Sequence, residues 1–273
     1  MKKGRIEECF EELRREGRAG TIAYITAGDP SLGRTAEYVL ALERAGVDLV
    51  ELGVPFSDPL ADGRVNQESA ERALRAGATL GGVIDMVREL RARTRLPIIF
   101  YSYLNPLLAH GGFEDSVRRM SDAGVDGLLV LDLPPEEAGE ADQALDRHGI
   151  APIRLITPTS TTARIRRIVR RARGFVYCVS RAGVTGAHDR LSDEAGDVMA
   201  RTRAETRLPL ALGFGISTPE TAAQAAKMAD AVVVGSALVQ RLHEAEPRGA
   251  AGLEDCMAWM HSLTDAVREA RRG

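Results

Sequence analysis

The chain has 273 residues and a formal net charge of -3 without a long basic run, so it has no general attraction to nucleic acid or anionic lipid. Its three cysteines are too few and too scattered for a disulfide framework, which indicates a reducing compartment. The N-terminal segment lacks the apolar core of a signal peptide, and no apolar stretch approaches the roughly 18 residues of a membrane span. We therefore expect a soluble, cytoplasmic protein.

In chain order, a segment with the charge spacing of a helix comes first, at residues 4–16, and eight short β-rich runs follow. The runs are continuously apolar, which is typical of parallel strands covered on both faces. Amphipathic segments long enough for helices lie between them. The β-rich runs are residues 21–26, 49–55, 97–103, 127–133, 151–157, 175–180, 209–215 and 231–236. The helical segments are residues 31–46, 112–124, 134–149, 162–172, 218–229 and 253–271.

This alternation predicts an α/β fold, a single-domain (β/α)8 TIM barrel over residues 1–273 with an extra N-terminal helix. No Pro-rich or Ser-rich linker divides the chain, which favours a closed barrel over two doubly wound halves. The phrase "AGVD" precedes the second and fourth strands, where Gly46 and Gly124 can end a helix in the left-handed conformation. The extra helix is placed to close the bottom of the barrel.

Polar residues collect where the predicted strands end, which is where barrels of this type carry their working groups. They are Glu51 in the second strand, Asp58 and Asp62 on the loop after it, Tyr103 and Asn105 at the end of the third strand, Asp132 at the end of the fourth and Tyr177 in the sixth.

Glu51 is the most informative of these residues because it lies within an apolar run. Burying an unpaired carboxylate costs several kcal/mol or forces it to take up a proton. A strand residue that faces the barrel mouth has no turn or cap to serve, so we interpret Glu51 as an acid or base with a raised pKa. Asp58 and Asp62 can be interpreted more simply as residues that stabilise a turn, since aspartate is common in turns.

Two glycine-containing loops, "GFGIS" at 213–217 and "GSALV" at 235–239, follow the seventh and eighth strands. Backbone amides at such glycines, together with the start of a helix, attract anions, and this pair of loops forms the phosphate site of many barrels. Gly186 of the sixth loop would complete a cup for a phosphate monoester. The alternative is that these are simple turn glycines.

Other motifs are missing from the sequence. The five histidines show no metal-binding spacing, and we expect no metal. Neither GxGxxG nor the P-loop pattern occurs, so neither a dinucleotide nor a triphosphate is indicated.

Six motifs together resemble the alpha subunit of tryptophan synthase over nearly the whole chain. They are "ITAGDPS", "VELGVPFSDPLADG", "AGVDGLLVLDLPPEE", "SRAGVTGA", "GFGIS" and "VVVGSALV". The resemblance implies a carbon–carbon lyase of tryptophan biosynthesis that cleaves indole-3-glycerol phosphate to indole and glyceraldehyde 3-phosphate without a cofactor of its own. It also implies an α2β2 complex whose β subunit carries pyridoxal phosphate.

The implied reaction is a retro-aldol cleavage, which needs a proton delivered to ring carbon C3 and another removed from the neighbouring hydroxyl. By the resemblance, Glu51 is the acid and base, Asp62 accepts the ring N–H, and Tyr177 lies near Glu51. Thr185 matches a loop threonine that positions Asp62.

The resemblance also assigns binding residues. The phosphate cradle matches Gly186, Phe214, Gly215, Gly235 and Ser236. The regions that meet the β subunit match Asp58, Pro59, Asn105 and Pro106.

Three residues depart from the usual pattern of the family. Arg64 replaces a proline and adds a cation that could pair with Asp62. Asn66 and Leu131 are expected to point into the substrate pocket. These departures leave open a specialised paralogue, either a stand-alone indole-releasing lyase or an enzyme for a related aldol or retro-aldol reaction on another substrate. A catalytically weak activator of a β subunit is a third alternative, against which the intact Glu51 and Asp62 argue.

Overall fold

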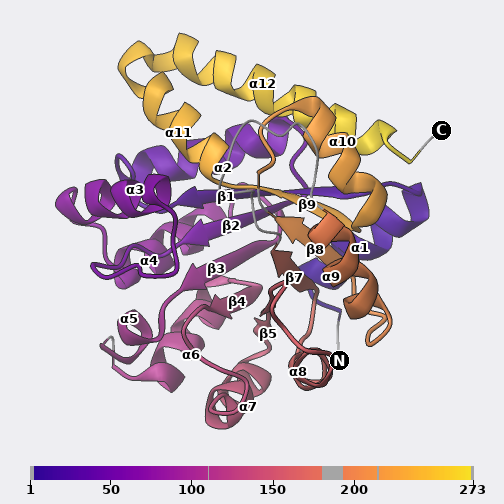
Figure 1. Cartoon of the computed structure of the whole chain (residues 1–273). Coiled ribbons are helices and arrows are strands. Elements are labelled where there is room, and N and C mark those ends of the chain that lie inside the picture. The colour runs from indigo at the N-terminus through magenta and orange to yellow at the C-terminus, as the bar shows by residue number, and fades with distance from the viewer. Residues whose placement is uncertain (1–2, 110, 180–192, 214, 272–273) are drawn as a thin grey trace.

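The computed structural model describes residues 3–109, 111–179, 193–213 and 215–271, and its parallel strands lie inside a layer of helices (Figure 1). The strands are β1 (Gly20–Thr26), β2 (Leu49–Gly53), β3 (Ile98–Ser102), β4 (Gly127–Val130), β5 (Ala151–Pro152), β6 (Arg154–Ile156), β7 (Val176–Val179), β8 (Leu210–Gly213) and β9 (Ala231–Val234). The helices are α1 (Arg5–Glu16), α2 (Leu32–Arg44), α3 (Arg64–Arg75), α4 (Leu80–Leu90), α5 (Leu104–Ala109), α6 (Phe113–Ala123), α7 (Gly139–His148), α8 (Thr162–Val169), α9 (Asp193–Arg203), α10 (Pro219–Met228), α11 (Ser236–Ala245), the 3-10 helix η1 (Glu246–Arg248) and α12 (Gly249–Glu269).

The sheet closes on itself through residues 151–156. Its strand order is β5-β4-β3-β2-β1-β9-β8-β7-β6, and the paired strands run parallel. The first strand in this order, β5, pairs with β4, and the last, β6, pairs with β7. Only Ile153 separates β5 from β6 in the chain, so the two ends of the sheet meet and the predicted barrel is confirmed.

The fifth predicted strand is divided into β5 and β6. Pro152 has no N–H with which to continue a ladder. The segment also changes partner at this point, because Ile153 donates its N–H to Leu128 O at 2.9 Å, whereas Pro152 O accepts the N–H of Arg173 at 3.0 Å. The barrel therefore keeps its predicted closure although one of its eight predicted strands is built from two short ones.

The inside of the barrel holds a hydrophobic core separate from the one between the sheet and the helices. Alternate residues of each strand face inward, as Phe175 and Tyr177 do. At the end where the strands begin, Ile6, Phe10 and Leu13 of α1 join this inner core, and the Phe10 ring lies 5.6 Å from that of Phe175. The extra helix thus closes the bottom of the barrel, as predicted, and leaves the other end for polar groups.

The aspartates of the repeated "AGVD" phrase join neighbouring strands at the closed end. Asp48 accepts the backbone N–H of Thr21 at 2.8 Å and pairs with Arg18 at 2.8 Å. Asp126 accepts the backbone N–H of Ile98 at 2.9 Å. Each aspartate precedes one strand and binds the start of the strand beside it, so the phrase helps to set the register.

Most predicted helices are confirmed, at α1, α2, α6, α8, α10 and α12. Gly46 and Gly124 follow α2 and α6 with φ values of 89° and 87°, so both glycines end helices as expected. The prediction for residues 134–149 was wrong at its start, since α7 begins at Gly139 after a turn that contains two prolines. Helices α3, α4, α5, α9 and α11 were not among the predicted helical segments. No helix in the described ranges combines the length and the apolarity needed to cross a membrane.

Candidate active site

Glu51 lies inside the barrel at the middle of β2, with 1% of its surface exposed. Its neighbour in register on β1 is Tyr24. A side chain at Gly53 would collide with the hydroxyl and ring of Tyr24, so glycine there leaves room for this tyrosine. Neither carboxylate oxygen of Glu51 has a hydrogen-bond partner among the described residues. The hydrogen-bonding capacity of both oxygens is therefore unused within the described structure.

Burial is the main cause that raises the pKa of Glu51 to about 8, and the negative charge of Asp62 raises it further. The group is consequently protonated for the most part at neutral pH. A carboxyl with this pKa can donate a proton and later accept one at the same pH. The interpretation of Glu51 as a buried group with a raised pKa is confirmed.

Asp62, on the loop between β2 and α3, is held by two tyrosines of the β3 segment. Tyr101 donates its hydroxyl proton to Oδ1 at 3.0 Å, and Tyr103 donates to Oδ2 at 2.8 Å. The Tyr103 hydroxyl accepts the backbone N–H of Ala61 at 2.9 Å, which also fixes the loop. Two strand residues thus position a carboxylate that the loop alone would leave free to move.

The surroundings of Asp62 act on its charge in two directions. Burial is the largest influence and raises the pKa of the Asp62 carboxyl above its usual value, while hydrogen bonds from Tyr103, Tyr101 and Asn66 offset part of this rise. Each carboxylate oxygen has two lone pairs, so Asp62 keeps the capacity to accept another hydrogen bond. The donors around Asp62 favour its ionised form, and the absence of described donors around Glu51 favours its protonated form.

Tyr177 lies on β7. In the strand order, β7 is reached from β2 through β1, β9 and β8, whereas β3, which holds the Asp62 loop, is the other neighbour of β2. A side chain at Gly213 would collide with the Tyr177 hydroxyl, so this glycine provides the space for it. Burial and the charge of Glu51 hold the pKa of Tyr177 well above its usual value. Its hydroxyl therefore remains a hydrogen-bond donor near Glu51.

Tyr24 and Tyr101 also lie among the polar side chains around Glu51 and Asp62, but they were not singled out in the sequence. Their rings meet edge to face with centroids 5.1 Å apart. Inward-facing residues of a strand recur every second position. Counting in twos from the buried Ile22 and Ile99 leads to Tyr24 and Tyr101, so the signal was present in the sequence.

The three departures from the family pattern lie in different surroundings. The expectation that Arg64 could pair with Asp62 was wrong, because its side chain is 89% exposed and pairs with Glu68 at 2.7 Å, four residues along α3. Asn66 does face the pocket with Asp62, and its buried Oδ1 has no hydrogen-bond partner in the described structure. Leu131 packs against the inner core of the barrel.

The candidate phosphate residues follow two adjacent strands, β8 and β9. Gly215 has φ 72° and is exposed, and Gly235 directly precedes Ser236, the exposed first residue of α11. Helix starts and turns of this kind offer free N–H groups to anions. The other members assigned to this part of the site, Thr185, Gly186 and Phe214, lie outside the described residues.

Other polar residues near the strand ends have structural partners. Asp132 accepts the backbone N–H of Leu104 at 2.7 Å, at the start of α5. The exposed Asp58 accepts a hydrogen bond from Ser57 at 2.5 Å. In the part of the chain that the structure describes, no group of three or more His, Cys, Asp or Glu side chains is placed to hold a metal ion.

Comparison with known proteins gives one consistent result. Residues 10–268 match the family described as "Tryptophan synthase alpha chain". The chain is 51% identical to the tryptophan synthase alpha chain of Geobacter sulfurreducens, over 86% of this chain and 89% of that one. It is 48% identical to that of Phenylobacterium zucineum, over 100% and 98%. The crystal structure of the alpha subunit from Legionella pneumophila is similar with a TM-score of 0.90 and 36% identity, over 97% and 99%.

The burial of Glu51 predicts a pH-dependent effect of Glu51→Gln on stability. The unfolded chain releases this proton near pH 4.5, but the folded protein holds it until about pH 8, so between these values unfolding releases a proton and becomes more favourable as the pH rises. Glutamine has no such proton. The stability of the variant relative to the unchanged protein should therefore increase by about 1.4 kcal/mol per pH unit in this range.

Denaturant unfolding of both proteins from pH 5 to pH 8 measures this slope. Glu68→Gln is the matched control, because Glu68 is exposed and should give no comparable slope. A stability difference for Glu51→Gln that does not change with pH would mean that Glu51 is charged in the folded protein.

Proposed function

The chain belongs to the tryptophan synthase alpha chain family, and on this premise we propose that Glu51 and Asp62 are its catalytic carboxylates. The reaction is the cleavage of indole-3-glycerol phosphate in tryptophan biosynthesis, a carbon–carbon lyase reaction. The family uses no cofactor in this chain, and pyridoxal phosphate belongs to the β subunit. The observation that carries the proposal is a buried Glu51 with a raised pKa and no hydrogen-bond partner among the described residues, near an Asp62 that two tyrosines hold.

Glu51 is proposed to move both protons of the reaction. In its resting, protonated form it delivers a proton to ring carbon C3. The resulting carboxylate then takes the proton of the side-chain hydroxyl while the bond between C3 and the side chain breaks, and its electron pair returns to the ring. The hydroxyl carbon becomes the aldehyde of glyceraldehyde 3-phosphate, indole leaves, and Glu51 is protonated again, so no other proton donor is required.

Asp62 is proposed to stabilise the charge that this first step creates. Protonation of C3 places positive charge on the ring nitrogen, and a carboxylate that accepts the ring N–H lowers the energy of that state. Tyr101 and Tyr103 already hold both Asp62 oxygens in place, so little reorganisation is needed when the charge develops. Tyr177 is proposed to support Glu51 and to donate a hydrogen bond to the substrate side chain, without transferring its proton.

The phosphate of the substrate is proposed to lie at Gly215, Gly235 and Ser236. The support is their position after β8 and β9 and at the start of α11, where backbone N–H groups and the helix dipole favour an anion. The family resemblance adds Gly186 and Phe214 to the phosphate cradle and Thr185 as a residue that positions Asp62. A phosphate held there would orient the substrate with its ring toward the Asp62 loop.

Replacing either carboxyl should remove most indole release from indole-3-glycerol phosphate. We expect Glu51→Gln to lower kcat at least about 100-fold, because it abolishes acid–base catalysis, and Asp62→Asn to lower it by a similar factor, because the ring cation loses its counter-charge. In the unchanged protein kcat should fall as the pH rises through about 8, since the acid form of Glu51 starts the reaction.

The assay follows indole by absorbance or fluorescence, with Glu68→Gln as a control that should keep normal activity. Near-normal turnover by Glu51→Gln would refute its role. Turnover that persists well above pH 8 would contradict the requirement for a protonated Glu51.

Tyr101→Phe should weaken the reaction through Asp62 without contact to the reacting atoms. Loss of one hydrogen bond to a charged group costs about 1.5–3 kcal/mol, so we expect kcat to fall about 10-fold or more. The pKa of Asp62 should rise, which moves the acidic limb of the pH–rate profile to higher pH. The measurement is that profile for Tyr101→Phe and Tyr103→Phe.

Tyr38→Phe is the matched control, because it removes a hydrogen bond from a tyrosine to the carboxylate of Glu246 outside the barrel. Its profile should not change. If Tyr101→Phe lowers kcat but leaves the acidic limb in place, the tyrosine acts by packing and not through the charge of Asp62.

We also propose that the chain binds a tryptophan synthase β subunit in an α2β2 complex, as solved tryptophan synthase structures from Mycobacterium tuberculosis suggest (TM-score 0.87, 32% identity, over 98% of this chain and 99% of that one). The proposed contact surface comprises the loop at 55–62, with Asp58 and Pro59, and α5, with Asn105 and Pro106. Leu60 is 91% exposed and Leu108 is 50% exposed, and large apolar side chains on a surface are typical of interaction sites.

Leu60→Asp should weaken this association and the rise in indole release that a β subunit causes, while the isolated chain keeps its activity. The reason is the cost of burying a charge at an apolar contact. Co-purification and indole release with and without the β subunit measure both effects. Leu74→Asp on α3, which is 37% exposed, is the control. Fast release by the isolated chain, unaffected by the partner, would instead support a stand-alone lyase.

A further inference from the structure

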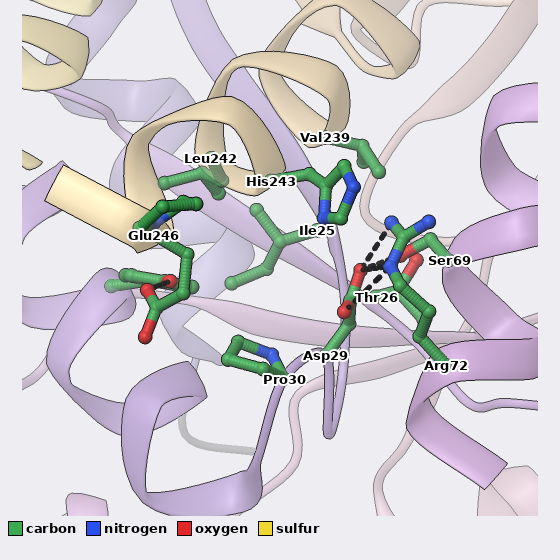
Figure 2. A pocket seen from close by; sticks show the side chains of 12 residues that line it. Ile25, Thr26, Asp29, Pro30, Ser69, Arg72, Val239, Leu242, His243 and Glu246 are labelled. Atoms are coloured by element: carbon green, nitrogen blue, oxygen red, sulfur yellow. Dashed lines mark hydrogen bonds and ion pairs between the residues drawn. The ribbon is translucent and has the colours of Figure 1, made fainter. Parts of the chain in front are cut away.

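A second cavity lies outside the barrel interior, between the end of β1, α3 and α11 (Figure 2). Its volume is about 310 Å³, at the lower end of the range of about 300–1,000 Å³ for small-molecule sites. Neither Glu51 nor Asp62 lines it. The proposed reaction therefore does not account for this cavity.

One wall of the cavity is apolar. Ile25 of β1 and Val239 and Leu242 of α11 line it, and all three belong to the buried part of the molecule. Pro30 lines the cavity from the loop after β1. A wall of this kind favours the hydrocarbon part of a ligand, because burial removes apolar surface from water.

Arg72 lines the same cavity, and some of its N–H donors have no acceptor among the described residues. Its Nε and Nη2 groups bind Asp29, with Nη2 2.7 Å from Oδ2 and Nε 3.1 Å from Oδ1. Asp29 also accepts a hydrogen bond from Ser69 at 2.6 Å. A guanidinium group has five N–H donors, and no other acceptor for Arg72 occurs among the described residues, so its Nη1 group stays free.

His243 lies on the same side of the cavity as Arg72 and Asp29, and Glu246 lies on the other side (Figure 2). Neither ring nitrogen of His243 has a hydrogen-bond partner among the described residues. Glu246 is neutralised by Arg34, whose Nη2 lies 2.9 Å from Oε2. Arg72 is paired with Asp29 in the same way, so both carboxylates that line the cavity have a guanidinium partner, and the exposed Glu68 of α3 interacts electrostatically with Arg72 and His243.

From this arrangement we propose that the cavity binds a small apolar monocarboxylate, with its carboxylate at Arg72 and His243 and its ring or chain against Ile25, Val239 and Leu242. A planar guanidinium matches a carboxylate well. A neutral apolar molecule would leave the free N–H group of Arg72 without an acceptor. The site is independent of the proposed reaction.

The cavity shares a helix with the catalytic pocket. Ser69 and Arg72 of α3 face the cavity, whereas Asn66 and Ala70 of the same helix line the pocket of Asp62. Thr26 lines both. The two sites are therefore neighbours that share Thr26, so an experiment on the cavity has to distinguish it from the catalytic pocket.

Benzoate is the probe, and isothermal titration calorimetry and the thermal unfolding midpoint are the readouts. A ligand that binds only the folded state raises the midpoint. We expect benzoate to bind and to raise Tm, acetate to do so much less because it lacks the apolar part, and benzyl alcohol to do so much less because it lacks the charge. Equal effects of benzoate and benzyl alcohol would overturn the role of Arg72 and His243.

Variants locate the probe. His243→Ala should weaken benzoate binding several-fold, and Arg72→Lys, which keeps a charge near Asp29 but loses the planar donor pair, should weaken it about tenfold. Leu242→Phe should fill the cavity and weaken binding further. His261→Ala, an exposed histidine of α12, is the matched control and should leave binding unchanged.

Indole release separates this proposal from the catalytic one. His243→Ala and Leu242→Phe should keep their indole release while they lose benzoate binding. Benzoate binding that is unaffected by His243→Ala and Arg72→Lys but is lost on addition of indole-3-glycerol phosphate would place the probe in the catalytic pocket and overturn the proposal. Failure of the catalytic assignment would not change the expected binding results.

Discussion

The site depends on one constraint, which is the burial of the Glu51 carboxyl inside a closed ring of strands without a hydrogen-bond partner in the described structure. Such burial makes the charged form costly and moves the proton affinity into the neutral range. It requires a barrel closed around Glu51 and sealed at the bottom, which residues 151–156 and α1 provide. It also requires space for tyrosines around the carboxyl, which Gly53 and Gly213 provide.

The second carboxyl, that of Asp62, differs from Glu51 because hydrogen-bond donors surround it. Asp62 lies on a loop whose tip is exposed to solvent, yet Tyr101 and Tyr103 bind both of its oxygens. The donors come from the β3 segment and its end, so the position of a loop residue is fixed by the sheet. Burial raises the pKa of both carboxyls, but the described donors offset part of the rise at Asp62 and none does so at Glu51.

Helix α3 connects this pocket with the rest of the molecule. It begins directly after the Asp62 loop, its Asn66 lines the pocket, and its Arg72 binds Asp29 on the loop after β1. The helix is therefore anchored to β1 on one side and to the catalytic loop on the other. This arrangement leaves the cavity between α3 and α11 with an unused part of the Arg72 guanidinium, while the exposed Arg64 contributes only an ion pair along the helix.

The sequence by itself determined the alternation of strands and helices, the extra helix, the turn glycines and the position of Glu51 in a strand, because hydrophobic pattern and glycine placement are local properties. It did not determine the division of the fifth strand, because that follows from a change of partner strand between β4 and β7. It suggested a pairing of Arg64 with Asp62, which the direction of α3 excludes. Only the tertiary structure decided that Tyr101 and Tyr103 bind Asp62 and that Arg72 meets His243 at one cavity, because these residues are distant in the chain and their contacts depend on how the strands and helices pack.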